Sequence, residues 1–198
     1  MLRFPLFLLL AMATASAVIP QFVTLGFMHI LPHGPDHVLF ILALFFLNRS
    51  FGVLLFQMTL FTLAHSLTLG LALYGIISVP TAVVEIAIAL SIAFVAIENL
   101  FLDGLSRWRP WLVFGFGLIH GLGFAHSFRE MPLEPADFLP AVFSFNLGIE
   151  LGQLAVVGLA AALIAMGSRM KIQFEMLSRP ASTLIAGCGI YFAAMRMF

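Results

Sequence analysis

Three histidines and an aspartate stand at the head of a strongly apolar stretch, GFMHILPHGPDHVLFILALFF, at residues 26–46. Imidazole nitrogen combined with carboxylate oxygen suits nickel, zinc, cobalt or copper(II), whereas calcium and magnesium prefer oxygen ligands alone. Two prolines and a glycine lie among these polar residues, and proline interrupts a straight helix. The stretch therefore predicts a transition-metal site at a break in a helix.

Further ligand-type residues occur in the later apolar segments. Asn146 and Glu150 are four residues apart, so they share one face of a helix. His65 has a second interpretation, as a residue that hydrogen-bonds between helices, and His29 has one as a solvated interfacial residue. The candidate metal ligands are His29, His33, Asp36, His37, His65, Glu85, His120, Asn146 and Glu150.

The composition decides the environment of these residues. Of 198 residues, 62% are hydrophobic and 9% are charged, and the mean hydropathy is +1.12. Soluble domains carry about 25% charged residues. This chain has too few charged side chains to cover the surface of a soluble protein, so it is predicted to lie in a membrane. With a net charge of zero and few basic residues, a nucleic-acid partner is excluded. The expected partners are a metal ion and the lipid bilayer, and a homo-oligomer is left open.

Apolar runs of about 20 residues predict helices that span the bilayer. The sequence therefore predicts an all-α, polytopic transmembrane bundle of six core helices, preceded by a signal peptide or an extra helix. The six segments are residues 20–47, 50–74, 80–101, 110–128, 138–166 and 180–197. A break in the first of them is acceptable in a membrane where the freed backbone groups line a polar cavity.

The first 17 residues have the features of a bacterial signal peptide. Arg3 is followed by the apolar run PLFLLLAMA and by Ala15-Ser16-Ala17, a small-residue cleavage site. We expect residues 1–17 to be a signal peptide, with an uncleaved helix as the alternative. Residues 18–198 are then a single transmembrane domain.

Basic residues gather after the first, third and fifth segments, which the positive-inside rule assigns to the cytoplasm. The expected location is the bacterial inner membrane, with several passes and both termini in the periplasm. In that orientation every histidine, together with Asp36, Glu85 and Glu150, falls towards the outer half of the bilayer. Near the cytoplasmic end, Glu98 is expected to pair with charges around Arg107.

Glycines favour close helix packing in two segments. They are Gly115, Gly117, Gly121 and Gly123 in the fourth segment, and Gly148 and Gly152 in the fifth.

Five motifs together resemble the HupE/UreJ family of membrane proteins, and most closely its second branch. They are the stretch quoted above, FTLAHSLTLGLA, VEIAIALSIAFVAIEN, FGFGLIHGLGFA and FNLGIELGQ, and they cover residues 22–166. The family's characterised members look like nickel permeases associated with hydrogenase or urease maturation. Their signature is a histidine followed, several residues later, by Asp-His in the first helix.

The resemblance assigns Asp36 and His37 to the Asp-His pair. His29 and His33 are both candidates for the upstream histidine, and the separation of His29 from Asp36 looks one residue longer than in the permease branch. The resemblance also implies a carboxylate in the third helix, matched by Glu85, and a histidine in the fourth, matched by His120. Nickel as the preferred ion comes from this resemblance, and Zn²⁺ or Co²⁺ are the alternatives.

The leading hypothesis is a secondary transporter or permease for a divalent transition metal rather than an enzyme, and the resemblance favours nickel. An intramembrane zinc-dependent hydrolase is the alternative, since histidines, an aspartate and a nearby serine can hold zinc and an activated water. A haem-binding anchor, with His65 and His120 as axial ligands, is a third hypothesis.

Overall fold

The computed structural model describes residues 6–47, 50–102, 104–129, 135–169, 171 and 173–197. Within them the chain is all-helical, as the sequence predicts. The elements are α1 (Leu6–Ile30), α2 (Pro35–Leu47), α3 (Phe51–Leu73), α4 (Thr81–Phe101), α5 (Arg109–Arg129), the short 3-10 helix η1 (Pro135–Asp137), α6 (Phe138–Arg169) and α7 (Phe174–Met197).

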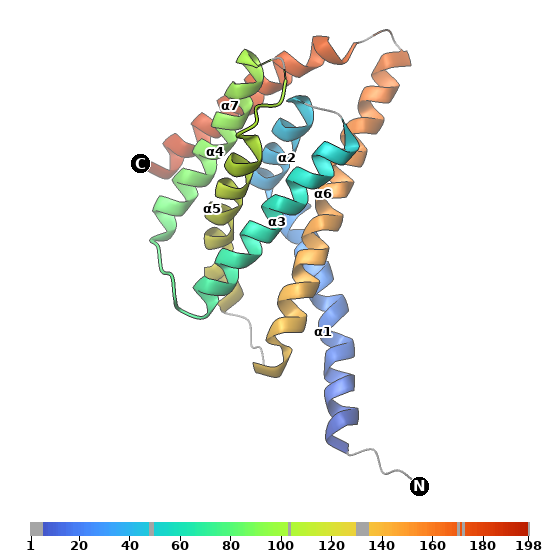
Figure 1. Cartoon of the computed structure of the whole chain (residues 1–198), viewed down its shortest axis with the longest axis vertical. Coiled ribbons are helices and arrows are strands. Elements are labelled where there is room, and N and C mark those ends of the chain that lie inside the picture. Colours follow the sequence, from blue (N-terminus) through green and yellow to red (C-terminus); the bar gives the residue numbers. More distant parts are fainter. Residues whose placement is uncertain are drawn as a thin grey trace.

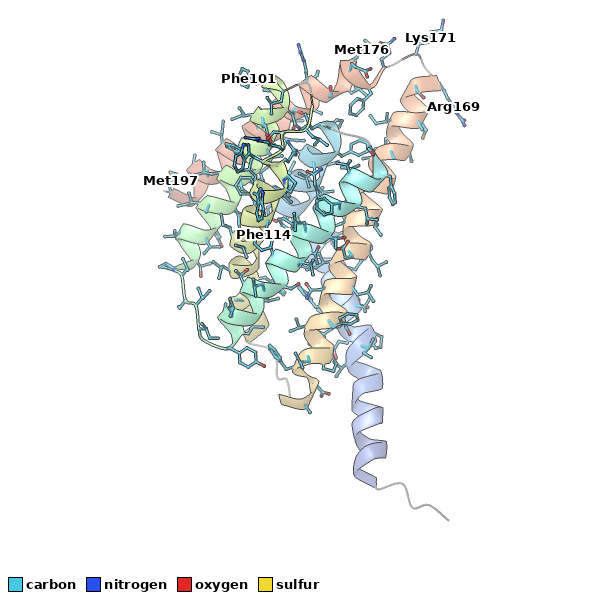
Figure 2. All side chains as sticks on the ribbon, viewed as in Figure 1. Phe101, Phe114, Arg169, Lys171, Met176 and Met197 are labelled. Carbon is cyan, nitrogen blue, oxygen red and sulfur yellow. The ribbon has the colours of Figure 1, made fainter. Side chains whose placement is uncertain are left out.

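The helices form a bundle around α2, which is short and central (Figure 1). The most extensive contacts are those of α1 with α6, α3 with α5, and α4 with α7, and α2 contacts α1, α3, α4, α6 and α7. Helices α2, α4 and α6 end where α3, α5 and α7 begin, which we call the α6–α7 end; the opposite end is the α3–α4 end. Arg169 and Lys171 lie at the α6–α7 end (Figure 2).

The break predicted in the first segment lies between α1 and α2, whose axes differ by 70°. Pro32 and Pro35 each lack the amide hydrogen that a continuous helix needs, and Pro35 begins α2, where that loss costs nothing. The remaining amides of the turn are bonded: His33 N–H donates to Met28 O at 3.1 Å and Gly34 N–H to Ile30 O at 3.3 Å. A Cβ at Gly34 would overlap the carbonyl of His29, so glycine is required at this bend.

Several helices are long and apolar enough to cross a membrane. In the described residues these are α3, α4 and α6, and the bent pair formed by residues 18–30 and α2 can serve as one further span. Helix α1 runs without interruption from Leu6 to Ile30, through the segment predicted as a signal peptide. The chain is therefore a membrane protein of the polytopic helical kind, while cleavage of residues 1–17 stays a prediction.

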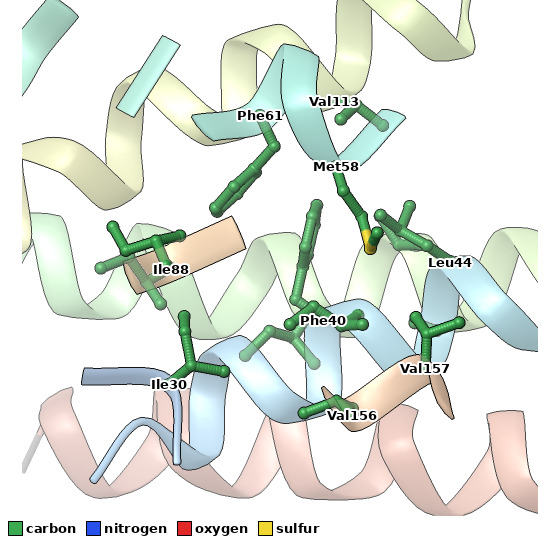
Figure 3. Close-up of a cluster of buried hydrophobic side chains, with 14 of the residues drawn as sticks. Ile30, Phe40, Leu44, Met58, Phe61, Ile88, Val113, Val156 and Val157 are labelled. Carbon is green, nitrogen blue, oxygen red and sulfur yellow. The ribbon is translucent and has the colours of Figure 1, made fainter. Parts of the chain in front are cut away.

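One part of the core beside α2 is apolar. Phe40 and Leu44 of α2 and Met58 and Phe61 of α3 are each at most 2% exposed, and the rings of Phe40 and Phe61 lie 4.9 Å apart. Figure 3 shows these side chains filling the space between the two helices. This group, called the α2–α3 plug below, lies on the α6–α7 side of the bend.

Glycines let two helix pairs, α1 with α6 and α3 with α5, approach at backbone distance, as the sequence predicts. A Cβ at Gly148 of α6 would overlap the Val23 carbonyl of α1, and a Cβ at Gly121 of α5 would overlap the His65 carbonyl of α3. Gly117 meets the Phe61 carbonyl in the same way. Gly115 is the exception, because nothing lies within 4 Å of its would-be Cβ.

Replacing Gly148 by alanine tests the α1–α6 contact. The added methyl group overlaps the backbone of α1, so we expect Gly148→Ala to lower the free energy of unfolding by about 1–3 kcal/mol. Gly158 is the matched control in the same helix, because its Cβ would meet open space. Gly158→Ala should stabilise the helix by up to about 1 kcal/mol. Denaturant unfolding of the detergent-purified protein measures both, and equal effects would contradict the close contact.

Candidate functional site

Four histidine rings converge where α1 bends into α2. The ring of His37 lies 4.6 Å from that of His29, 5.9 Å from that of His65 and 5.1 Å from that of His120, between centroids. His29 and His65 are 5.9 Å apart. The four residues come from α1, α2, α3 and α5, and the side chains of His37, His65 and His120 are at most 4% exposed. We call this group the histidine cluster.

Asp36 acts on the cluster through His37. Its Oδ1 lies 3.1 Å from His37 Nδ1 and also accepts the His37 backbone N–H at 2.9 Å. A carboxylate accepts hydrogen bonds, so the His37 proton resides on Nδ1 and the lone pair on Nε2. A carboxylate that orients a histidine in this way is a recurrent feature behind metal ligands. Asp36 is thus placed to fix the tautomer of His37 rather than to bind beside it.

His120 is held in the same tautomer by the backbone. Its Nδ1 lies 2.8 Å from the carbonyl oxygen of Phe116, which can only accept, so Nδ1 carries the proton. The Nε2 atom of His120 then offers a lone pair to the cluster. Two histidines of the cluster therefore have their second ring nitrogen fixed as a metal-type donor.

The donor nitrogens of the cluster are buried without partners. Within the described part of the chain, Nε2 of His29, His37 and His120 and both ring nitrogens of His65 have no hydrogen bond. An unpaired buried polar group costs about 1–3 kcal/mol, so several in one place call for a ligand. For His65 this absence removes support from the interpretation as an interhelical hydrogen-bonding residue.

The donor atoms do not yet surround one point. Among the described His, Cys, Asp and Glu side chains, no three have the arrangement of metal ligands. The rings are nevertheless close, and rotation about their side-chain torsions redirects a nitrogen without moving the backbone. A metal bound here would therefore require side-chain rotation, which is freest for His65, since neither of its ring nitrogens has a hydrogen bond in the described part of the chain.

Aromatic residues close the cluster. The ring of Phe124 lies 4.2 Å from that of His29, and the ring of Phe61 lies 4.9 Å from that of His120. Phe145 stacks on Phe124 at 4.8 Å. The cluster therefore lies in an apolar enclosure, where electrostatic interactions are strong.

Four of the predicted ligands lie apart from the cluster: His33, Glu85, Asn146 and Glu150. His33 is in the turn between α1 and α2, but its side chain is exposed. Glu85 of α4 pairs with Arg196 of α7, with Oε2 and Nε 3.7 Å apart, and Arg196 also donates to the Glu85 carbonyl at 2.9 Å. Glu85 thus links α4 to the end of α7.

Asn146 and Glu150 lie in a groove of about 430 Å³ between α3 and α6. Asn146 Nδ2 donates to the Val142 carbonyl at 2.7 Å, and the Glu150 carboxylate is hydrogen-bonded by Thr59 and Thr62 of α3. The expected shared face of these two residues is real, but it faces the groove and not the histidine rings.

The amino-acid sequence was compared with those of known protein families. A family model described as HupE / UreJ protein matches residues 8–196, nearly the whole chain. The chain belongs to the HupE/UreJ family. No curated protein and no solved structure matches it. The family is associated with nickel or cobalt transport or with accessory functions.

A buried ion pair in this HupE/UreJ chain was missed by sequence reasoning. Arg109 is 2% exposed, and its Nη1 donates to Glu98 Oε2 at 2.5 Å while its Nε donates to Gln57 Oε1 at 3.1 Å. The sequence places Glu98 near Arg107 at an interface, whereas the structure pairs it with Arg109 inside the bundle. Two arginines one residue apart give no signal that distinguishes which of them points inward.

Removing two unpaired nitrogens should stabilise the metal-free protein. With chelator present, His65→Leu is expected to raise the free energy of unfolding by about 1–3 kcal/mol, because both ring nitrogens of His65 lack partners. His33→Leu, at an exposed position of the same turn region, should change it by less than about 0.5 kcal/mol. Denaturant unfolding in detergent measures both, and a loss of stability in the His65 variant would mean that its ring is already satisfied.

Breaking the buried ion pair between Glu98 and Arg109 should lower the free energy of unfolding, in contrast to His65→Leu. Glu98→Gln leaves the Arg109 charge uncompensated, and we expect a loss of about 3–5 kcal/mol in the free energy of unfolding. Glu175→Gln, at an exposed carboxylate of α7, should cost less than about 0.5 kcal/mol. The double variant Glu98→Gln/Arg109→Met should recover most of the loss. Failure of the second substitution to restore stability would argue against the pair.

Proposed function

We propose that this HupE/UreJ protein is a permease for a divalent transition metal, with Ni²⁺ as its substrate and the histidine cluster as its binding site. One observation carries the proposal: rings from four helical segments meet with their buried nitrogens unpaired. Imidazole donors suit nickel, cobalt and zinc. The family's association with nickel or cobalt favours nickel among these ions.

The ligand set is suited to an ion that must leave again. Neutral imidazoles bind through lone pairs, and the carboxylate of Asp36, which lies next to the cluster, is engaged with His37. A divalent ion at this site keeps most of its positive charge in an apolar enclosure, which limits affinity. Transport requires such moderate binding, whereas a permanent catalytic metal requires a closed and more strongly charged ligand set.

The apolar α2–α3 plug separates the cluster from the α6–α7 end. Phe40 and Leu44 belong to α2, and α2 is joined to α1 through the bent turn at residues 31–34. We infer that a shift of α2 about this turn opens the plug and lets the ion pass. Discontinuous helices at binding sites are a general device of secondary transporters.

We assign the α6–α7 end to the cytoplasm and the protein to a bacterial inner membrane. Arg107, Arg169, Lys171 and Arg179 lie at or near that end, and positive charge favours the cytoplasmic side. Entry is then from the periplasm, next to the bend. Inward movement of a divalent ion gains about 4.6 kcal/mol per 100 mV from the membrane potential, at 2.3 kcal/mol per charge.

Metal binding by purified protein provides the test. Protein washed with chelator and titrated with NiCl₂ should bind about one Ni²⁺ in the micromolar range, and Asp36→Asn/His37→Ala should abolish this binding. His33→Ala is the matched control from the exposed part of the same turn and should keep it. Vesicles that contain the wild-type protein should take up ⁶³Ni²⁺, and those that contain the double variant should not.

Other outcomes of this experiment separate the competing functions. Stoichiometric zinc that survives the chelator wash, and is lost in the double variant, would contradict the permease and favour the zinc-dependent hydrolase. Equal nickel binding by the double variant would place the site elsewhere. Binding with no uptake would restrict the protein to an accessory role.

A further inference from the structure

The groove between α3 and α6 has an excess of hydrogen-bond acceptors. Ser66 Oγ donates to the Thr62 carbonyl at 2.6 Å, and Asn146 Nδ2 donates to the Val142 carbonyl at 2.7 Å, so both donors face the backbone. The amide oxygen of Asn146 is buried and has no partner among the described residues. Among the described residues, the carboxylate of Glu150 has the hydroxyls of Thr59 and Thr62 as its hydrogen-bond donors.

The Thr62 hydroxyl is itself shared. It also lies 3.4 Å from Oε1 of Gln153, one turn beyond Glu150, and one hydroxyl has a single proton to give. The described residues that line the groove include no lysine, arginine or histidine. The Glu150 carboxylate and the Asn146 amide oxygen, one turn apart on the same face of α6, therefore line the groove with few hydrogen-bond donors around them.

The site also lies at the depth where an unpaired carboxylate is costly. Glu150 is near the middle of α6, and the residues flanking the groove, such as Leu63 and Phe143, are 61% and 74% exposed as lipid-facing side chains are. A carboxylate within a bilayer is expected to be paired, protonated or bound to a cation. Hydroxyl, amide and carboxylate oxygens are ligands of hard cations.

The charge of the groove selects the valence of the ion. One carboxylate contributes a single negative charge, which a monovalent cation neutralises, whereas a divalent ion would leave net positive charge in hydrocarbon. We propose that the groove is a Na⁺ site formed by Thr59, Thr62, Asn146 and Glu150. Sites for Na⁺ near the middle of the bilayer are a general feature of secondary transporters.

The groove and the histidine cluster share helix α3. Thr62 and Ser66 face the groove, and His65 lies between them in sequence and faces the cluster. Occupancy of the groove by Na⁺ therefore acts on the same turn of α3 that carries His65. Coupling of Na⁺ to metal movement rests on the proposed permease function, whereas Na⁺ binding to the groove does not.

Thermal unfolding of the full-length protein in detergent tests the Na⁺ site. NaCl is compared with choline chloride at equal ionic strength and fixed pH, after chelator treatment. We expect NaCl to raise the unfolding midpoint of the wild type by a few degrees in a saturable manner, because a ligand that binds only the folded state stabilises it. Glu150→Gln should abolish the Na⁺ response, and Thr59→Ala, a change at an exposed residue, should weaken it.

Glu85→Gln is the matched control, because Glu85 is a membrane carboxylate that already has Arg196 as its partner. It should keep the full Na⁺ response. An equal effect of choline, a wild type that ignores Na⁺, or a Na⁺ response retained by Glu150→Gln would each overturn the proposal. A midpoint governed by pH and not by Na⁺, and sensitive to Glu150→Gln, would also overturn it and identify a proton site instead.

Nickel binding by the histidine cluster and Na⁺ binding by the groove can be tested independently. Nickel titration of Glu150→Gln should give wild-type binding if the groove and the cluster are distinct sites. Na⁺ stabilisation that persists in Asp36→Asn/His37→Ala supports the groove even if no nickel binds. Loss of nickel binding in Glu150→Gln, with no effect of Na⁺ on the wild type, would instead return Glu150 to the metal site and overturn the Na⁺ proposal.

Discussion

The unpaired imidazole nitrogens at the bend between α1 and α2 are the constraint on which the rest of the structure depends. In an apolar enclosure each of them costs free energy that a bound partner would recover. Tight backbone contacts hold them together nevertheless: Gly121 brings α5 against the carbonyl of His65, and Gly34 brings the turn against that of His29. The favourable packing of these helices thus offsets the cost of keeping the unpaired nitrogens close together. That arrangement is expected of a site shaped for a ligand and not for stability alone.

Helix α2 combines two tasks that are usually divided between elements. Its first turn carries Asp36 and His37, which contribute to the cluster, and its next turns carry Phe40 and Leu44, which close the bundle behind the cluster. Because α2 is joined to α1 through a bent turn and contacts five other helices, any movement of α2 changes both the ligands and the seal. In the proposed permease, binding and gating would therefore be coupled through one short helix, with no need for a long pathway of side chains.

The sequence alone predicted the elements and the break well, because hydropathy and proline act locally. It also identified His29, Asp36, His37, His65 and His120, which the structure brings together. Sequence could place Glu85, Asn146 and Glu150 only by depth, at the same level as the histidines. The direction in which a residue faces depends on the rotation of its helix, and that rotation is set by packing against neighbours, such as the contact of Gly148 with α1. The inward turn of Arg109 towards Glu98 has the same origin.

The nitrogen and oxygen donors lie at the same depth but face different sides of α3, and this has a chemical consequence. Nitrogen donors gather on one face of α3 and oxygen donors on the neighbouring face, so two kinds of ligand set coexist at one level of the bundle. Imidazole nitrogens discriminate against hard alkali ions, and an oxygen set with one carboxylate discriminates against divalent ions through charge. A single mixed set of all nine predicted ligands would hold a divalent metal too strongly for release. In the two proposed sites, dividing the donors between two faces of α3 would keep each site weak and selective, as the release of a transported ion requires.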